Sequence, residues 1–435
     1  ERMSAFERRP LHRRFAELLT ENVEQNGGSW MEISHQYEHA GDRQRSLEYR
    51  IRELSRLTSL AFIPFLSETA ENPVALDPEI VLTQCAKCQA ALKTVFSEKT
   101  DQERLRQLEC ELLEARGVAE IYSGAYAQGI ADLGDLSGAS GDRNGLRQLR
   151  LCTLLGELAI RQQDVVRAER YMATGLRILE RKRNAFYMAA FRRLQGCCFL
   201  LRRAYEKAGY YIIEAIEPLE TMPARGGSRL QLALAYSDYG RLSRYQGKFA
   251  KACSFFKKAL ALLDGREWAF AVWIYVHYGR TVYALEDHLT AGALFDEACR
   301  IAEKTGVLAG RTAAETYAAI YALRAADEAA AARHLKNAIV YVEKCASPLE
   351  TSIFYFGCMT IRLLLDKSPS ESEALQKLLP ENAKEYAHLG IKSAKNIPDI
   401  YEVEEMQAVL RSNFSQKDRY YASELYSKNK WFMTE

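Results

Sequence analysis

A period of about forty residues is the feature that most constrains how this chain can fold. Small residues recur at six nearly even positions, which are Gly117, Gly156, Gly196, Gly240, Gly279 and Ala319. The steps between them are 39, 40, 44, 39 and 40 residues. Periods of about 20–50 residues are typical of proteins in which similar units stack on their neighbours. We therefore expect an array of stacked units.

The segments between these positions have a helical pattern. Apolar residues recur at i, i+3, i+4 and i+7, and only 10 prolines and 25 glycines interrupt the 435 residues, so helices are favoured throughout. Helix-breaking residues gather where units would join, at residues 134–145, 223–227, 264–265 and 306–310. The second of these groups accounts for the step of 44 residues.

The clearest unit runs from Leu232 to Leu263 and contains a turn signal, Gly247-x-Phe249. Gly240 is followed at steps of 12, 16 and 19 by Ala252, Phe256 and Ala259, and the same steps from Gly279 lead to Ala291, Phe295 and Ala298. This spacing resembles the tetratricopeptide (TPR) repeat, in which a small residue in the first helix allows the second helix to approach. The period exceeds the usual TPR length of about 34 residues, so longer helices or linkers are expected.

These patterns predict an all-α fold, a right-handed superhelix of TPR-like helix-turn-helix repeats (an α-solenoid). Six repeats would occupy residues 107–342. Residues 343–435, where the pattern fades, are expected to form capping helices that cover the apolar face of the last repeat. Residues 61–106 would be atypical N-terminal helices, and residues 1–60 a helical linker.

The first sixty residues carry a further resemblance. A helical pattern from Leu11 to Leu19 is followed by the segment Ile33-Ser-His-Gln-Tyr-Glu-His-Ala-Gly-Asp42 and by Ser46-Leu-Glu-Tyr49. This arrangement resembles the segment that joins the nucleotide-binding part to the TPR superhelix in MalT-like signal-transduction ATPases (STAND-type), which are large bacterial regulators. The resemblance implies a superhelix that senses an inducer or an inhibitory partner, with the ATPase and output domains elsewhere. Since helical pattern begins close to Glu1, we expect a fragment of a larger protein.

Charge and hydropathy favour neither nucleic acid nor membrane as a partner. Lys and Arg number 59 against 57 Asp and Glu, which gives a formal charge of +2 and no large field to attract polyanions. The mean hydropathy is −0.28, and no long apolar run or signal peptide is evident. The ten cysteines are scattered, as in reduced proteins. A cytoplasmic location, with no direct nucleic-acid or membrane contact, is expected.

Two pairs of residues have the spacing of metal ligands. Cys85 and Cys88 are separated by two residues, and His35 and His39 would lie one helical turn apart. A structural zinc site needs four ligands, and no second Cys pair follows at a suitable distance. We interpret the cysteines as buried small residues and the histidines as surface and packing residues, with a metal or redox role as the less favoured alternative.

Sequence motifs of catalysis are missing from the chain. It contains no Gly-x4-Gly-Lys-Ser/Thr phosphate loop and no Gly-x-Ser-x-Gly nucleophile motif. Acidic residues occur with Lys and Arg at helical spacing, which is typical of solvated faces. We therefore expect a binding protein without cofactor or metal, and not an enzyme.

Arginines and aromatic residues converge on the first helices of the repeats. Counted from the small residue, offsets −6, −3, +1, +4 and +5 should face the groove of a TPR superhelix. The residues expected to bind a ligand are Arg193, Arg241, Arg244, Tyr245, Trp273, Arg280 and Tyr283, and Arg161 would extend the set. Arg suits carboxylate or phosphate and aromatics supply rigid contact area, so an anionic peptide or small acid is the expected ligand.

The alternative is that these side chains only line a wet groove. The arginines would then pair internally with Glu157 and Glu286, while the aromatic residues and Leu234 pack between repeats. If the arginines bind a ligand from an exposed groove, replacing one should weaken binding and hardly change folding.

Two functional hypotheses follow. The first is a non-enzymatic ligand- or protein-binding TPR sensor region of a larger cytoplasmic regulator of signalling or transcription, whose partners include its own ATPase and output domains. The alternative is a free-standing TPR scaffold that docks partner peptides or proteins.

Overall fold

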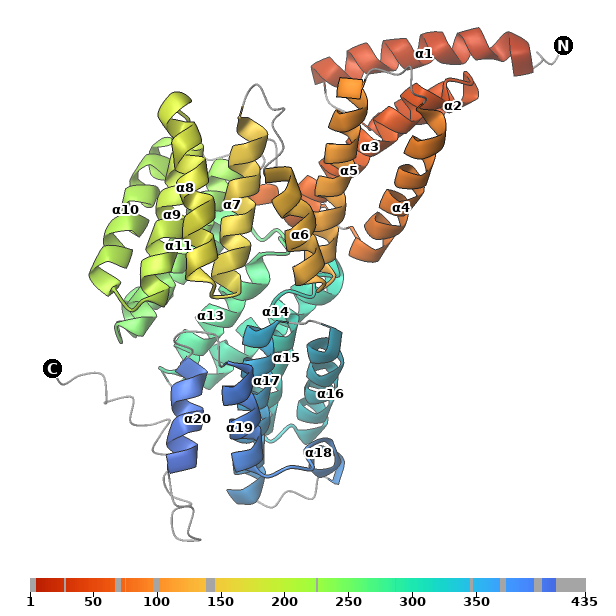
Figure 1. Ribbon diagram of the computed structural model, residues 1–435. Coiled ribbons are helices and arrows are strands. Elements are labelled where there is room, and N and C mark those ends of the chain that lie inside the picture. Colours follow the sequence, from red (N-terminus) through yellow and green to blue (C-terminus); the bar gives the residue numbers. More distant parts are fainter. Residues whose placement is uncertain are drawn as a thin grey trace. The chain divides into compact units, whose positions relative to one another are not determined.

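The computed structural model describes residues 5–26, 29–66, 72–74, 76–96, 102–137, 145–223, 226–285, 287–344, 347–367, 373–394 and 401–411. Within these ranges every regular element is a helix and no strand occurs (Figure 1). The chain divides into two compact units. Unit 1 comprises Glu1–Ile63, Val74–Tyr122 and Ala127–Ala139, and unit 2 comprises Pro64–Pro73, Ser123–Tyr126 and Ser140–Glu435.

Unit 1 consists of N-terminal helices followed by one helical hairpin. Its elements are α1 (Ala5–Asn26), α2 (Trp30–His39), α3 (Arg43–Phe62), α4 (Pro78–Val95), α5 (Gln102–Tyr122) and α6 (Tyr126–Ser137). Asp42 and Asp77 cap α3 and α4, since each side chain accepts a hydrogen bond from a backbone N–H of the first turn. The α5–α6 hairpin holds the Gly117 repeat, so that repeat groups with the N-terminal helices.

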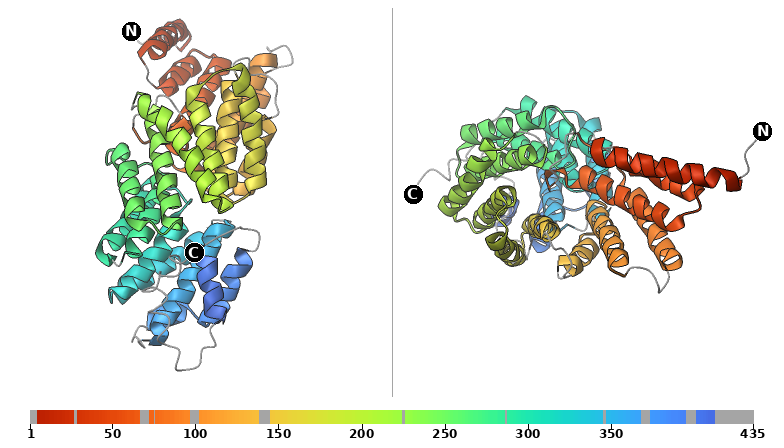
Figure 2. Two further views of the ribbon diagram at one scale, coloured as in Figure 1. Left: turned by 90° about the vertical axis from the view of Figure 1, so that its left-hand side faces the viewer. Right: turned by 90° about the horizontal axis from the view of Figure 1, so that it is seen from above.

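Unit 2 contains five consecutive helix pairs. They are α7 (Leu146–Arg161) with α8 (Val165–Arg181), α9 (Ala185–Leu201) with α10 (Tyr205–Thr221), α11 (Gly226–Tyr245) with α12 (Phe249–Leu263), α13 (Ala271–Tyr283) with α14 (His288–Thr305), and α15 (Arg311–Arg324) with α16 (Glu328–Lys344). Each helix packs against its partner and against the next pair. In Figure 2 the colours run in chain order from yellow to blue through these pairs.

In several pairs the small residue in the first helix faces the residue sixteen positions later in the second helix. A Cβ added at Gly240 would lie 2.9 Å from the Phe256 ring, and one at Gly279 would lie 2.6 Å from the Phe295 ring. The same close approach joins Gly196 to Ile212, at 2.5 Å. These contacts confirm the register predicted from the sequence, because glycine alone leaves room for the second helix.

In four pairs of unit 2, the turn between the two helices has one residue in the left-handed region. Gly247 has a φ of 70°, and at equivalent positions Gln163, Arg203 and Ala326 have φ values of 59°, 57° and 60°. The expected glycine is therefore replaced by other residues in three turns. Asp164 and Asp327 follow directly and accept hydrogen bonds from backbone N–H groups of the next helix, which helps to start that helix.

Helices continue beyond the six predicted repeats. They are α17 (Pro348–Lys367), α18 (Glu373–Leu378), α19 (Ala383–Ser393) and α20 (Tyr401–Arg411). α17 packs against α15 and α19, and the Ser352 hydroxyl donates a hydrogen bond to the Gly390 carbonyl across that second contact. α17 thus follows α15 as the first helix of a further pair would.

A short segment, η1 (Pro64–Leu66), belongs to unit 2 and packs against α11. Its Phe65 is buried, and the Phe65 and Phe270 rings meet edge to face with centroids 5.7 Å apart.

The predicted fold class, an all-α superhelix of TPR-like repeats, is confirmed. None of the helices in the described ranges is both long enough and apolar enough to cross a membrane.

Candidate functional site

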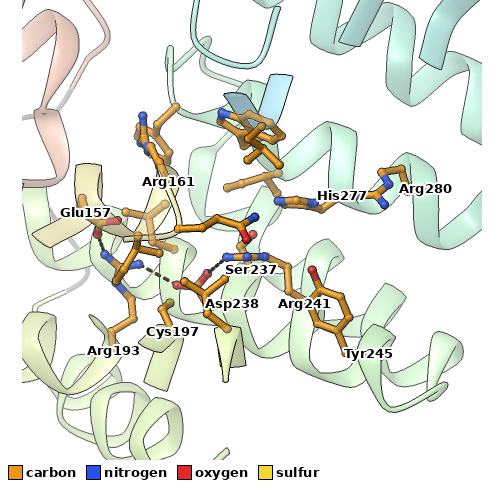
Figure 3. Close-up of a pocket in the computed structure, with 18 of the residues that line it drawn as sticks. Glu157, Arg161, Arg193, Cys197, Ser237, Asp238, Arg241, Tyr245, His277 and Arg280 are labelled. Carbon is orange, nitrogen blue, oxygen red and sulfur yellow. Dashed lines mark hydrogen bonds and ion pairs between the residues drawn. The ribbon is translucent and has the colours of Figure 1, made fainter. Parts of the chain in front are cut away.

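A pocket in unit 2 is formed by the first helices of four consecutive pairs, α7, α9, α11 and α13, with Phe270 and two side chains of α17. Its volume is about 120 Å³, which is room for on the order of ten water molecules or a small side chain. Figure 3 shows the polar and charged residues that line it: Glu157, Arg161, Arg193, Cys197, Ser237, Asp238, Arg241, Tyr245, His277 and Arg280.

One wall of the pocket is a buried ionic cluster centred on Arg193, whose side chain is only 2% exposed. The Arg193 guanidinium pairs with Glu157 from α7 and with Asp238 from α11, where Nη1 and Oδ2 are 2.7 Å apart. Its Nε also donates to the Gln231 Oε1 at 3.2 Å. The cluster therefore joins three consecutive first helices. A charge this deeply buried is tolerated because it is paired and hydrogen-bonded.

Arg241 connects this cluster to the open part of the pocket. Its Nη1 lies 3.0 Å from Asp238 Oδ1, and its side chain is 18% exposed. Burial opposes the charge of Arg241, yet the Asp238 carboxylate raises the pKa of the guanidinium above its ordinary value. Asp238 thus accepts from two arginines, one on each side, as the dashed lines in Figure 3 show.

The pocket has more positive than negative side chains. Four arginines and two carboxylates line it, a formal balance of +2. The cluster of Arg193, Arg241, Glu157 and Asp238 is neutral as a group, so the surplus comes from Arg161 and Arg280. Arg161 forms no ion pair with any described residue, and the Arg280 guanidinium lies 5.2 Å from the centre of the Tyr317 ring. An anionic group in the pocket would therefore meet more positive than negative side chains.

His277 lies between these arginines and is held neutral. Burial lowers the pKa of His277 well below its ordinary value, and the charges of Arg241, Arg280 and Arg244 lower it further. Its ring stacks on Trp273, with centroids 5.5 Å apart. The buried Nδ1 makes no hydrogen bond with the part of the chain that the structure describes. A neutral imidazole with an unpartnered ring nitrogen can accept or donate one hydrogen bond.

A buried thiol lines the pocket beside the ionic cluster, since Cys197 follows Arg193 by one turn of α9. Burial raises the pKa of Cys197, and the nearby Asp238 raises it further. Cys197 therefore stays protonated and contributes a small, weakly polar surface.

The structure brings five of the seven predicted residues to this pocket. They are Arg193, Arg241, Tyr245, Trp273 and Arg280, and Arg161 and Leu234 line it as well. Arg244 and Tyr283 are absent from its lining. The Arg244 guanidinium lies over the Tyr245 ring at 4.9 Å, and the Tyr283 ring lies under the Arg324 guanidinium at 5.0 Å.

The expectation that the groove arginines are exposed is wrong for Arg193 and Arg244, which are 2% and 8% exposed. Arg193 is buried because Glu157 and Asp238 meet it from both neighbouring pairs. Internal pairing with Glu157, the alternative considered from the sequence, therefore occurs. Glu286, the other acid that this alternative proposed as an internal partner, lies outside the described residues.

Asp238 and His277 were not among the predicted site residues. Asp238 stands at offset −2 and His277 at offset −2 from their respective glycines, one step from the counted offset −3. Both positions are therefore equivalent in consecutive repeats. A polar residue at offset −2 in two neighbouring first helices is the signal that could have identified them.

The residues with metal-ligand spacing lie in unit 1. Cys85 and Cys88 are buried on α4, and burial raises the pKa of Cys85 to about 12. His35 and His39 are both exposed on α2, with their Nε2 atoms 3.0 Å apart, and the His12 ring stacks on His39.

Comparison with known protein families gave a match for the central helices. The family model "Tetratricopeptide repeat" matches residues 231–304, from α11 to α14. The match agrees with the repeat spacing found in the sequence of these residues. The match includes the Gly240 and Gly279 pairs, whose first helices supply Asp238, Arg241, His277 and Arg280 to the pocket. The comparison with curated proteins found no match to this sequence.

Several solved structures resemble this chain at low identity. A Signal Transduction ATPase with Numerous Domains (STAND) protein with a tetratricopeptide repeat sensor, from Pyrococcus horikoshii, is 13% identical with a TM-score of 0.48 over 91% of this chain. The present chain spans 55% of the length of that protein.

Two further solved structures resemble the chain at similarly low identity. A Rap protein complexed with Competence and Sporulation Factor is 12% identical, with a TM-score of 0.46 over 84% of this chain and 97% of the other. Aspartyl phosphate phosphatase F from Bacillus subtilis is 13% identical, with a TM-score of 0.43 over 85% of this chain and 94% of the other.

Proposed function

We propose that this chain is a non-catalytic sensor region, in which the TPR pocket binds an anionic small molecule or an acidic group of a peptide or protein. The observation that carries the proposal is that the residues lining the pocket include four arginines and only two carboxylates, beside a His277 Nδ1 that makes no hydrogen bond with any described residue. Arg recognises carboxylate and phosphate through paired N–H donors, and Tyr245 and Trp273 supply rigid apolar contact area.

The setting we propose is a larger cytoplasmic regulator of signalling or transcription. Because the pocket is lined by first helices of four pairs, a ligand in it would contact several repeats at once. Binding would then stabilise one relative arrangement of those repeats over another. A ligand shifts the equilibrium between two conformations by the difference in its affinity for them. That change would be transmitted to ATPase or output domains of the full-length protein.

Thermal unfolding in the presence of a panel of acids tests the proposal. The panel contains inorganic phosphate, succinate, citrate and short peptides rich in Asp and Glu, and the control for each carboxylic acid is its amide. A ligand at 100 times its Kd stabilises the native state by about 2.7 kcal/mol, which raises the melting temperature measurably. We expect at least one acid, and none of the amides, to do so. Equal melting temperatures with every acid and amide would contradict the proposal.

The proposal that this chain is part of a larger regulator can be tested separately. Nucleotide-binding and output domains flanking this region in the complete gene product would support the regulator. A product without them, together with capture of peptides by the pocket, would favour the free-standing scaffold.

A further inference from the structure

Three side chains with metal-binding atoms meet in unit 2, away from the pocket. Cys299 comes from α14, Glu315 from α15 and His334 from α16. One ligand atom from each lies within 4.8 Å of the others. The three helices belong to two consecutive pairs, so the residues are distant in sequence and are brought together only by the stacking of the repeats.

The arrangement is ordered by hydrogen bonds. His334 Nδ1 lies 2.7 Å from Glu315 Oε2, and Asn337 Nδ2 donates to Glu315 Oε1 at 3.3 Å. A second carboxylate is close, since Asp296 Oδ1 is 4.0 Å from His334 Nε2. A metal-bound imidazole commonly has a carboxylate partner of this kind.

Two carboxylates and a thiol lie together in this cluster, with Arg311 and Arg333 nearby. Glu315 is 3% exposed, and a buried carboxylate requires a cation or a proton. Burial raises the pKa of the Cys299 thiol, and Glu315 and Asp296 raise it further, whereas Arg311 lowers it. Arg333 Nη2 is 3.4 Å from His334 Nε2 on the exposed side. A divalent cation among the three ligand atoms would satisfy Glu315 directly.

We propose that Cys299 Sγ, a Glu315 carboxylate oxygen and a His334 imidazole nitrogen bind a zinc-like divalent cation that links α14, α15 and α16. Thiolate, imidazole and carboxylate are the ligands that zinc takes in proteins, usually four in a tetrahedron. Asp296 or a water molecule supplies the fourth ligand. The Cys299 thiol releases its proton to solvent when the metal–sulfur bond forms.

The geometry requires only small movements. Zinc–ligand bonds of about 2.0–2.3 Å place the ligand atoms of a tetrahedral site roughly 3.3–3.8 Å apart. The observed atoms, already within 4.8 Å of one another, reach that spacing by side-chain rotation. The site would fasten the Gly279 pair to the Ala319 pair and stabilise this junction of the array.

The test uses the full chain, freed of metal with a chelator and then titrated with Co²⁺ and Zn²⁺. We expect one Co²⁺ per chain with the visible bands of a tetrahedral site and a sulfur-to-cobalt charge-transfer band. We also expect Zn²⁺ to displace it and to raise the melting temperature. Cys299→Ser and His334→Gln should each weaken binding by on the order of a hundredfold or more, beyond the loss caused by removing an outer partner.

Three further variants make the assignment specific. Cys253→Ser changes another partly buried thiol, His388→Gln changes an exposed histidine, and His35→Gln breaks the exposed His35–His39 pair. All three should bind one cobalt ion as the wild type does, with the same sulfur band. Absence of the sulfur band in the wild type, or its persistence in Cys299→Ser, would overturn the proposal. Loss of cobalt in His35→Gln alone would place the metal on α2 and also overturn it.

Discussion

At the scale of single residues, a charged side chain on a repeat helix can be either a ligand contact or part of the framework. Arg193 and Arg241 both occupy offsets that point toward the groove in a TPR unit, and their sequence contexts look alike. Arg193 is buried between Glu157 and Asp238, whereas Arg241 keeps 18% of its side chain exposed. The difference depends on acids in neighbouring repeats, about forty residues away, which local spacing does not show.

Removing the Arg193 guanidinium should destabilise the protein strongly. Arg193→Ala would leave Glu157, and in part Asp238, as buried carboxylates without their partner, which typically costs 3–5 kcal/mol. The free energy of unfolding from urea denaturation measures this loss. Arg192→Ala is the matched control, because Arg192 is less buried and its guanidinium contacts Gln195 and the Tyr211 ring. We expect it to lose about 1 kcal/mol or less. Similar losses in both variants would refute the framework role of Arg193.

His277 should make stability depend on pH in a defined direction. Its pKa is lowered in the folded state, so the unfolded chain takes up the proton first as the pH falls below about 6.5. The stabilisation is complete above that pH and decreases below it, by at most about 1.4 kcal/mol per pH unit for one proton. Chemical denaturation at pH 7.5, 6.5 and 5.5 measures this dependence.

His277→Gln should remove the part of the pH dependence of stability that is due to the His277 imidazole. His388→Gln, at an exposed site on α19, should retain it. A His277→Gln protein whose stability falls with pH as steeply as the wild type would show that the imidazole is not held neutral.

At the scale of helices, sequence spacing predicted the contacts within each pair and missed details of the turns. The steps of 12, 16 and 19 from Gly240 and Gly279 correspond to fully buried positions, because they reflect close packing of two helices. The turn seven residues after each small residue is less constrained in sequence. Gln163, Arg203 and Ala326 adopt the left-handed conformation there, which tertiary packing imposes although glycine would adopt it at lower cost.

A large side chain at a helix–helix contact should disrupt a pair. Ala252 is 0% exposed in α12, so Ala252→Trp overpacks the contact and should cost about 1–3 kcal/mol or more. The same is expected of Ala291→Trp in α14, which is equally buried. Ala250→Trp, two residues away on the exposed side of α12, is the control and should stay within about 0.5 kcal/mol of wild type. Melting temperatures are the measurement, and equal values for Ala252→Trp and Ala250→Trp would show that the register is wrong.

At the scale of the whole molecule, the sequence predicted the all-α repeat architecture and part of the pocket. It could do so because period and helical register are local, additive properties of the chain. The grouping of the α5–α6 hairpin with the N-terminal helices, and the place of α17 in the pocket, depend on contacts over long sequence separations. Asp238 and His277 were not predicted because they stand at offset −2, one residue from the offset of −3 expected to face the groove.

The central claim is that an anion binds among the arginines of the TPR pocket, and calorimetry of matched variants tests it most directly. The titrant is the acid that stabilises the wild type most in the thermal panel. Arg161→Ala and Arg280→Ala each remove a charged donor, so each should weaken binding by roughly 1.5–3 kcal/mol, or about ten- to a hundredfold, with little change in stability. Arg170→Ala, on the exposed face of α8, should bind as the wild type does. Unchanged affinity in both pocket variants, with intact folds, would contradict the claim.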